Sequence, residues 1–285
     1  MEKVSKIMFV SVFTNLILAI IKMIFGFIGK SSALLADGIH SLSDLITDFF
    51  AIIGSKLSEK PADSKHPYGH GKLEYLTSIV ISIVVLTLGI TLITNSFQKE
   101  IVIPDIIVIV VSIFTIIAKL ILSNYIINKG KKYQNNILIS SGYESRTDVI
   151  SSIVVLVSII LMQLSNYFEI LKYADILATI IVGLLIIKIG YSLLKENLSL
   201  LLDEQVTNEE YLLDLKKIIL KEESVITIDD LIIIKLGPCY KLVLEITMDE
   251  TKSLKEVHQV LDELEKRMKE YDSKIKYVTI HANPS

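Results

Sequence analysis

Residues 32–48 read Ser-Ala-Leu-Leu-Ala-Asp-Gly-Ile-His-Ser-Leu-Ser-Asp-Leu-Ile-Thr-Asp, and this stretch carries the main evidence for the fold class. It is apolar enough to form a membrane helix, yet it places His40, Asp44 and Asp48 at intervals of four residues. Residues with this spacing lie on one face of an α-helix. An ionisable side chain inside a membrane span is costly and therefore indicates a function. The stretch predicts a membrane helix with one functional polar face.

A second stretch, Gly-Tyr-Glu-Ser-Arg-Thr-Asp at residues 142–148, repeats the spacing with Glu144 and Asp148. Asp148 and Asp44 each lie roughly twelve residues into their helices, which at about 1.5 Å per residue puts both near the midplane. Four-coordinate binding by His and carboxylate suits a divalent first-row metal. We predict that His40, Asp44, Glu144 and Asp148 bind one such ion. The alternative is that these side chains cap helices or hydrogen-bond neighbouring spans.

Six apolar segments are long enough to span a bilayer, which takes about 20 residues. They comprise residues 7–28, 32–57, 73–97, 101–127, 136–164 and 173–194. The expected loops on one side carry nine lysines and those on the other side three, so both termini are predicted in the cytoplasm. The first span runs far past the apolar part of a signal peptide and is expected to stay in the protein.

Composition narrows the function further. The chain of 285 residues is 51% hydrophobic, and the excess lies before about residue 200. Its net charge of -3 gives no argument for nucleic acid as a partner. The single Cys239 excludes an intramolecular disulfide and a multi-cysteine zinc cluster.

A charged domain follows the spans. Thr207 or Asn208 is expected to cap a helix that runs to about residue 222, and Ser253 with Glu256 forms a capping box for a second helix to about residue 271. Strands are predicted at residues 225–235, 240–248 and 274–281. The sequence therefore predicts a membrane all-α domain of six helices over residues 1–205 and a small cytoplasmic α+β domain of αββαβ order over residues 206–285.

The loop between the second and third spans is dense in metal-ligand types. Asp63, His66 and His70 are predicted to hold a metal at the membrane surface, with a polar turn as the alternative. The His-x-x-x-His spacing lacks the Glu of a zincin protease, because Pro67 occupies that place and opposes a helix. With no activated nucleophile either, we do not expect an enzyme.

Other charged residues also fall in the spans. Asp48 lies one turn beyond Asp44 and either attracts the cation or pairs with Arg146. Lys22 and Lys119 are expected to pair with acidic residues or to extend toward the membrane surface.

Residues 32–44, 66–74 and 146–148 together resemble the cation diffusion facilitator family, and the similarity covers nearly the whole chain. The resemblance implies a homodimeric antiporter in the plasma membrane that exchanges a cytoplasmic divalent metal for protons. Its transport site would match the four residues named above, and an interfacial site would match Asp63, His66 and His70. An ion pair between Lys72 and Asp203 would link the third span to the start of the cytoplasmic domain. The terminal domain would be metallochaperone-like, and its possible regulatory metal positions fall on Asp229, Glu245, His258 and His281.

The sequence departs from the family pattern at the position that bears on metal choice. Zinc-transporting members usually carry His where this chain has Glu144, and a carboxylate suits harder ions. We expect Zn²⁺ or Fe²⁺ as the substrate, with Mn²⁺ and Co²⁺ behind them. In the terminal domain, Asp229 and Glu245 replace common His positions, and Asn283 stands where an Asp can occur. Alternatives are proton-coupled transport of another small solute, and a metal-sensing partner of another transporter.

Overall fold

The computed structural model describes residues 2–98 and 101–285, so two residues of a predicted outer loop lie outside it. The chain divides into two compact units. The first, called the membrane unit below, comprises Met1–Phe49 and Ile81–Leu193. The second unit comprises Phe50–Val80 and Leu194–Ser285. The division after residue 205 stays a prediction.

Six long helices form the N-terminal part of the described chain, as the sequence predicted. They are α1 (Glu2–Ile28), α2 (Ser32–Ser58), α3 (Leu73–Gln98), α4 (Ile106–Lys132), α5 (Asn136–Gln163) and α6 (Ala174–Leu201), with a 3₁₀ turn η1 (Glu169–Tyr173) before α6. Among the described residues, α1, α3, α4, α5 and the η1–α6 segment are long and apolar enough to cross a membrane. Helix α2 has the same length but carries the polar face described above.

The start of the fourth helix was predicted wrongly. Helix α4 begins at Ile106, five residues after the expected start at Ile101. Pro104 restricts the residue before it to extended backbone, and Asp105 at the N-cap is itself extended, with φ -62° and ψ 146°. Helix α6 in contrast continues past the expected end at residue 194 to Leu201, because charged residues end an apolar run without ending a helix.

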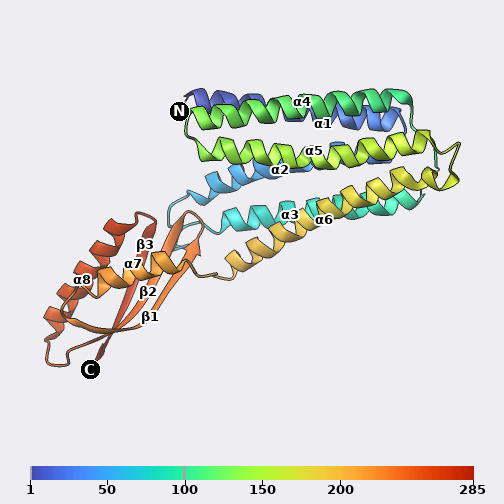
Figure 1. Ribbon diagram of the computed structural model, residues 1–285. Helices are drawn as coiled ribbons and strands as arrows, with labels where there is room; N and C mark the ends of the chain where they lie inside the picture. The colour runs from blue at the N-terminus through green and yellow to red at the C-terminus, as the bar shows by residue number, and fades with distance from the viewer. Residues whose placement is uncertain (1, 99–100) are drawn as a thin grey trace. The chain divides into compact units, whose positions relative to one another are not determined.

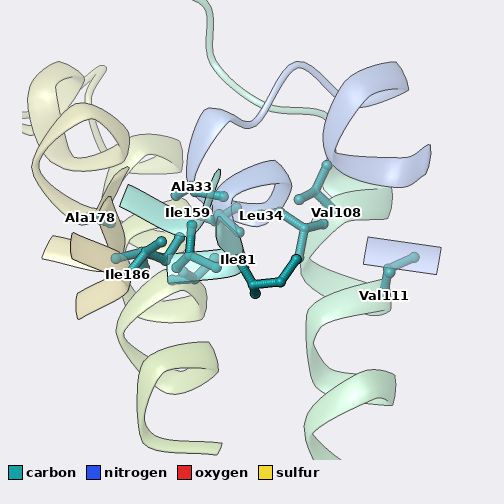
Figure 2. Packing of buried hydrophobic residues seen from close by; sticks show 12 residues of the cluster. Ala33, Leu34, Ile81, Val108, Val111, Ile159, Ala178 and Ile186 are labelled. Carbon is teal, nitrogen blue, oxygen red and sulfur yellow. The ribbon is translucent and has the colours of Figure 1, made fainter. Parts of the chain in front are cut away.

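The membrane unit has an apolar core in which five helices meet. Figure 2 shows aliphatic side chains of this core, which come from α2, α3, α4, α5 and α6, packed together. The buried members include Ala33, Leu34, Ile81, Val108, Val111, Ile159, Ala178 and Ile186. Many other large apolar side chains of these helices are exposed, as expected of a surface that faces lipid.

Helices α4 and α5 lie side by side along their lengths (Figure 1). Gly142 of α5 permits this close approach, because a Cβ atom there would collide with the side chain of Ile127 on α4. Small residues at helix contacts are the usual way for membrane helices to pack closely.

A buried ion pair joins α1 to α2 within this unit. Lys22 Nζ lies 2.7 Å from Asp37 Oδ2, and both side chains are 2% exposed. Ser152 of α5 completes the network, because its Oγ accepts from Lys22 Nζ at 2.9 Å and donates to Asp37 Oδ2 at 2.8 Å. This confirms the expectation that Lys22 pairs, and it gives the buried charge hydrogen-bonded partners on two helices.

The second unit contains the α+β domain, in the predicted αββαβ order. Its elements are α7 (Glu209–Ile219), β1 (Val225–Leu236), β2 (Cys239–Met248), α8 (Leu254–Tyr271) and β3 (Ile275–Pro284). The sheet order is β1-β2-β3, with β1 and β2 antiparallel and β2 and β3 parallel. Figure 1 shows α7 and α8 lying against the sheet, and Leu215, Leu264 and Met268 supply their buried side chains.

The helix starts of this domain follow the sequence. Asn208 caps α7 by accepting from the Tyr211 N–H, and Ser253 and Glu256 form the expected capping box of α8. Gly237 takes φ +65° in the turn between β1 and β2, a conformation that favours glycine.

The loop before α3 and the first turn of α3 contact this sheet within the same unit. The Gly237 N–H donates to the Tyr75 hydroxyl at 2.8 Å, and Lys241 Nζ donates to the Tyr68 hydroxyl at 3.1 Å. Tyr68 also packs edge-on against Tyr277 of β3, with ring centroids 5.1 Å apart. These contacts explain why residues 50–80 group with the C-terminal residues.

The Lys22–Asp37 pair predicts a stability effect. Asp37→Asn leaves the Lys22 charge buried without its counter-ion and should lower the free energy of unfolding by about 3–5 kcal/mol. Denaturant unfolding of the full chain in lipid nanodiscs measures this. The double variant Lys22→Met with Asp37→Leu removes both charges and should recover most of the loss. Equal stability of Asp37→Asn and the unaltered protein would contradict the assignment.

Candidate metal centre

The predicted transport residues sit on two helices of the membrane unit. Helix α2 carries His40 and Asp44 one turn apart, and α5 carries Asp148. One ligand atom from each of these three side chains lies within 4.8 Å of the others. His40 is buried, whereas Asp44 and Asp148 are partly exposed. The arrangement offers an imidazole nitrogen and two carboxylates around one point, which is a donor set for a divalent transition metal.

The His40 ring is free to act as a ligand. Its Nδ1 atom is buried and has no hydrogen-bond partner among the described residues. The nearest acidic atom is Asp44 Oδ2 at 3.7 Å, beyond ordinary hydrogen-bond length. A buried polar atom without a partner is rare in folded proteins, and it fits a ring nitrogen that binds a cation.

Glu144 lies outside this close group. Its side chain is exposed one turn before Asp148 on α5, where it interacts electrostatically with Asp148 and with Asp48 of α2. The alternative partner considered for Asp48, Arg146, instead donates a hydrogen bond to Asn124. Glu144 and Asp48 thus place negative charge beside the three clustered ligands, and the role of Glu144 as a fourth ligand stays a prediction.

A lysine also contacts the cluster. Lys119 of α4 is buried, and its Nζ lies 2.9 Å from Asp148 Oδ2. From the sequence, Lys119 was expected either to pair or to extend toward the membrane surface, and no partner was identified. The sequence also gave no role to Asp37, the counter-ion of Lys22, although a charged residue in a span signals that an opposite charge is near.

The residues of the predicted loop site, Asp63, His66 and His70, also lie close together, in the second unit. Ligand atoms of Asp63, His66 and His70 lie within 4.8 Å of one another. Asp63 Oδ1 is 3.1 Å from His66 Nδ1, and Asp63 Oδ2 is 3.4 Å from His70 Nε2. The backbone N–H of His66 is the main cause that holds the pKa of Asp63 below its ordinary value, with a further contribution from the N–H of Lys65. The Asp63 carboxylate thus lies between the imidazole rings of His66 and His70 and contacts both.

The expected ion pair between Lys72 and Asp203 is formed, with Nζ 2.7 Å from Oδ1. Lys72 Nζ also donates to the Leu201 carbonyl oxygen at 3.3 Å. Asp203 takes φ +66°, so the backbone at the end of α6 turns sharply where the pair forms. The pair ties the start of α3 to the end of α6 within the second unit.

The predicted C-terminal ligands are only partly gathered. Asn283 Nδ2 donates to Glu245 Oε1 at 2.9 Å and to Asp229 Oδ2 at 3.3 Å, and His281 pairs with Glu245 in the strand register. Thr247, and then Thr227, donate to Asp229 and lower its pKa. His258, on α8, instead faces Asp262, with 3.7 Å between Nε2 and Oδ2.

Comparison with known proteins gives a consistent assignment. The family model described as the cation efflux transmembrane domain matches residues 8–202. The model described as the cytoplasmic domain of cation efflux proteins, a dimerisation domain, matches residues 207–285.

Several curated proteins are similar along most of their length. An uncharacterized transporter of Methanocaldococcus jannaschii is 33% identical over 264 residues, which is 91% of each chain. The manganese efflux system protein MneP of Bacillus subtilis is 29% identical over 99% of this chain and 97% of its own. The manganese efflux system protein MneS of the same organism is 27% identical over 96% and 93% of the two chains.

The matched residues cover nearly all of the helix bundle and the α+β domain described above. The chain therefore belongs to the cation diffusion facilitator family, whose members are multi-pass membrane transporters that export divalent metal cations, a family of transporters and not of enzymes.

Proposed function

We propose that this protein exports a divalent transition metal from the cytoplasm in exchange for protons, across the plasma membrane and with both termini in the cytoplasm. The observation that carries the proposal is the cluster of His40, Asp44 and Asp148, whose ligand atoms lie within 4.8 Å of one another inside the membrane unit. Glu144 is the fourth ligand and closes on the ion from its exposed position one turn away.

Manganese is the first metal to test. Three carboxylates and one imidazole make a harder donor set than a His-rich zinc site, and two relatives that are similar over nearly their whole length are named manganese efflux system proteins. Zn²⁺ and Fe²⁺, favoured from the sequence, and Co²⁺ remain substrates to compare, because almost any nitrogen and oxygen site binds Zn²⁺ more tightly than Mn²⁺. Mg²⁺ and Ca²⁺ prefer more oxygen ligands than the cluster offers.

The acidic residues around the cluster give the ion a route. Asp48 and Glu144 are exposed on neighbouring helices and interact electrostatically, so they attract a cation toward Asp44 and Asp148. His40 is the most buried ligand and lies farthest along this route. The ion therefore exchanges water for carboxylate oxygens before it reaches the imidazole.

Proton exchange follows from the same ligands. A metal binds carboxylates and imidazole only in their deprotonated forms, so binding and protonation exclude each other at each ligand. Protons that reach the site from outside then replace the ion and complete the exchange.

The remaining metal positions are regulatory in this scheme. Asp63, His66 and His70 form a compact set of donors beside the sheet of the second unit. Binding there would bias the loop whose Tyr68 contacts Lys241, and so would couple cytoplasmic metal to the α+β domain. The positions around Asp229 and Glu245 would add a second cytoplasmic response in a homodimer.

Two substitutions separate metal binding from metal choice. Asp148→Ala should reduce transport of every metal to the level of protein-free liposomes, because it removes a ligand on α5. Glu144→His should raise the transport ratio of Zn²⁺ to Mn²⁺ several-fold, because it replaces a carboxylate by an imidazole. Competition uptake into proteoliposomes measures both. Glu169→Gln, an exposed acid outside the site, is the matched control. Full transport by Asp148→Ala would contradict the proposed site.

Proton release on metal binding is a further expectation. Titration calorimetry of the purified full chain with Mn²⁺ should give a binding enthalpy that depends on the ionisation enthalpy of the buffer, since each bound ion displaces protons into it. The dependence should be smaller in Asp44→Asn, in which a ligand without a lysine partner loses its titrating proton. An enthalpy at the transport site that is the same in all buffers would rule out this form of coupling.

A further inference from the structure

Lys119 occupies a place that the proposed transport chemistry does not explain. Its side chain is 5% exposed, and its Nζ lies 2.9 Å from Asp148 Oδ2, an oxygen of the proposed metal cluster. A positive side chain therefore holds a carboxylate that the cation itself needs.

The two buried lysines of the bundle differ in what surrounds them. Lys22 has Asp37 as its own counter-ion and Ser152 as an additional hydrogen-bond partner, and neither residue belongs to the metal cluster. The ion pair described for Lys119 is with Asp148, on the neighbouring helix. The close packing of α4 on α5 at Gly142 brings the two helices within reach of this interaction. Lys119 is thus placed on the site, whereas Lys22 serves the packing of the helices.

The charges of the site suit a divalent ion once Lys119 is included. Asp44, Glu144 and Asp148 contribute three negative charges when ionised, and the Lys119 ammonium contributes one positive charge, which leaves two to be compensated. The electrostatic influence of Lys119 extends to both Asp44 and Glu144. An ammonium and a divalent ion in contact with the same carboxylate oxygen would repel each other strongly in an apolar surrounding.

We infer that Lys119 is a tethered cation that competes with the transported metal for Asp148. The ammonium leaves Asp148 when the metal binds and returns when the metal departs, and it moves without losing its proton. Lysine suits this exchange because its charge is compact and sits on a flexible four-carbon stem. The competition weakens metal binding and so favours release of the ion. The inference rests on the proposed transport site and identifies a residue that sets the metal affinity of the site without being a ligand.

Titration of purified full-length protein in nanodiscs with Mn²⁺ alone tests the inference. Lys119→Met and Lys119→Gln remove the competing charge and should bind Mn²⁺ about tenfold or more tightly than the unaltered protein, as expected for a close charge pair. Lys119→Arg keeps the charge and should bind with affinity near that of the unaltered protein. Lys188→Met removes an exposed lysine of α6 and is the control for altering a charge in a span.

The outcomes separate this inference from the proposed function. Tighter binding in both neutral variants, absent from Lys119→Arg and Lys188→Met, supports the tethered cation. Unchanged or weaker binding in a folded neutral variant overturns it, as does failure of both neutral variants to fold while Lys119→Arg folds, since the pair would then be a requirement of the bundle. Absence of Asp148-dependent binding in the unaltered protein would instead overturn the proposed transport site.

Discussion

A charge inside an apolar helix bundle needs an opposite charge within reach, and this requirement organises the membrane unit. Lys22 and Asp37 meet it between α1 and α2, with Ser152 of α5 as a third partner. Lys119 and Asp148 meet it between α4 and α5. The first pair is fully enclosed and fixes helices relative to one another, whereas the second includes a partly exposed carboxylate of the metal cluster. The same electrostatic requirement thus accounts for a structural ion pair, Lys22–Asp37, and for the pair Lys119–Asp148, which we propose opens when the metal binds.

Helix packing determines which charges can meet. Small and β-branched residues such as Ala33, Val108 and Ala178 allow five helices to share one apolar core, and Gly142 brings α5 against α4. His40 and Asp44 then face Asp148 from α2, the helix with the polar face described above. The α+β unit is organised differently, because two amphipathic helices cover its sheet, and the loop before α3 and the start of α3 contact it.

The sequence predicted those features that depend on spacing along a single helix or strand. The i, i+4 repeat of His40 and Asp44, the capping box at Ser253 and the order of the strands all follow from local chemistry. Contacts between helices were harder to predict from the sequence. That Lys22 would pair could be argued from its place in a span, but the choice of Asp37 depends on how α1 and α2 are aligned. The exposed position of Glu144 likewise depends on the rotation of α5, and the late start of α4 depends on the backbone restriction that Pro104 imposes.

The proposed transport mechanism requires that the ion bind at the cluster of His40, Asp44 and Asp148. Crystals of the full chain grown in lipid and soaked in Mn²⁺ can be measured at the manganese absorption edge, where an anomalous difference map identifies the metal directly. We expect an anomalous peak coordinated by His40 Nδ1 and by carboxylate oxygens of Asp44 and Asp148, with Lys119 Nζ withdrawn from Asp148. Manganese found only at the loop residues Asp63, His66 and His70, with Lys119 still paired to Asp148, would contradict the proposed mechanism.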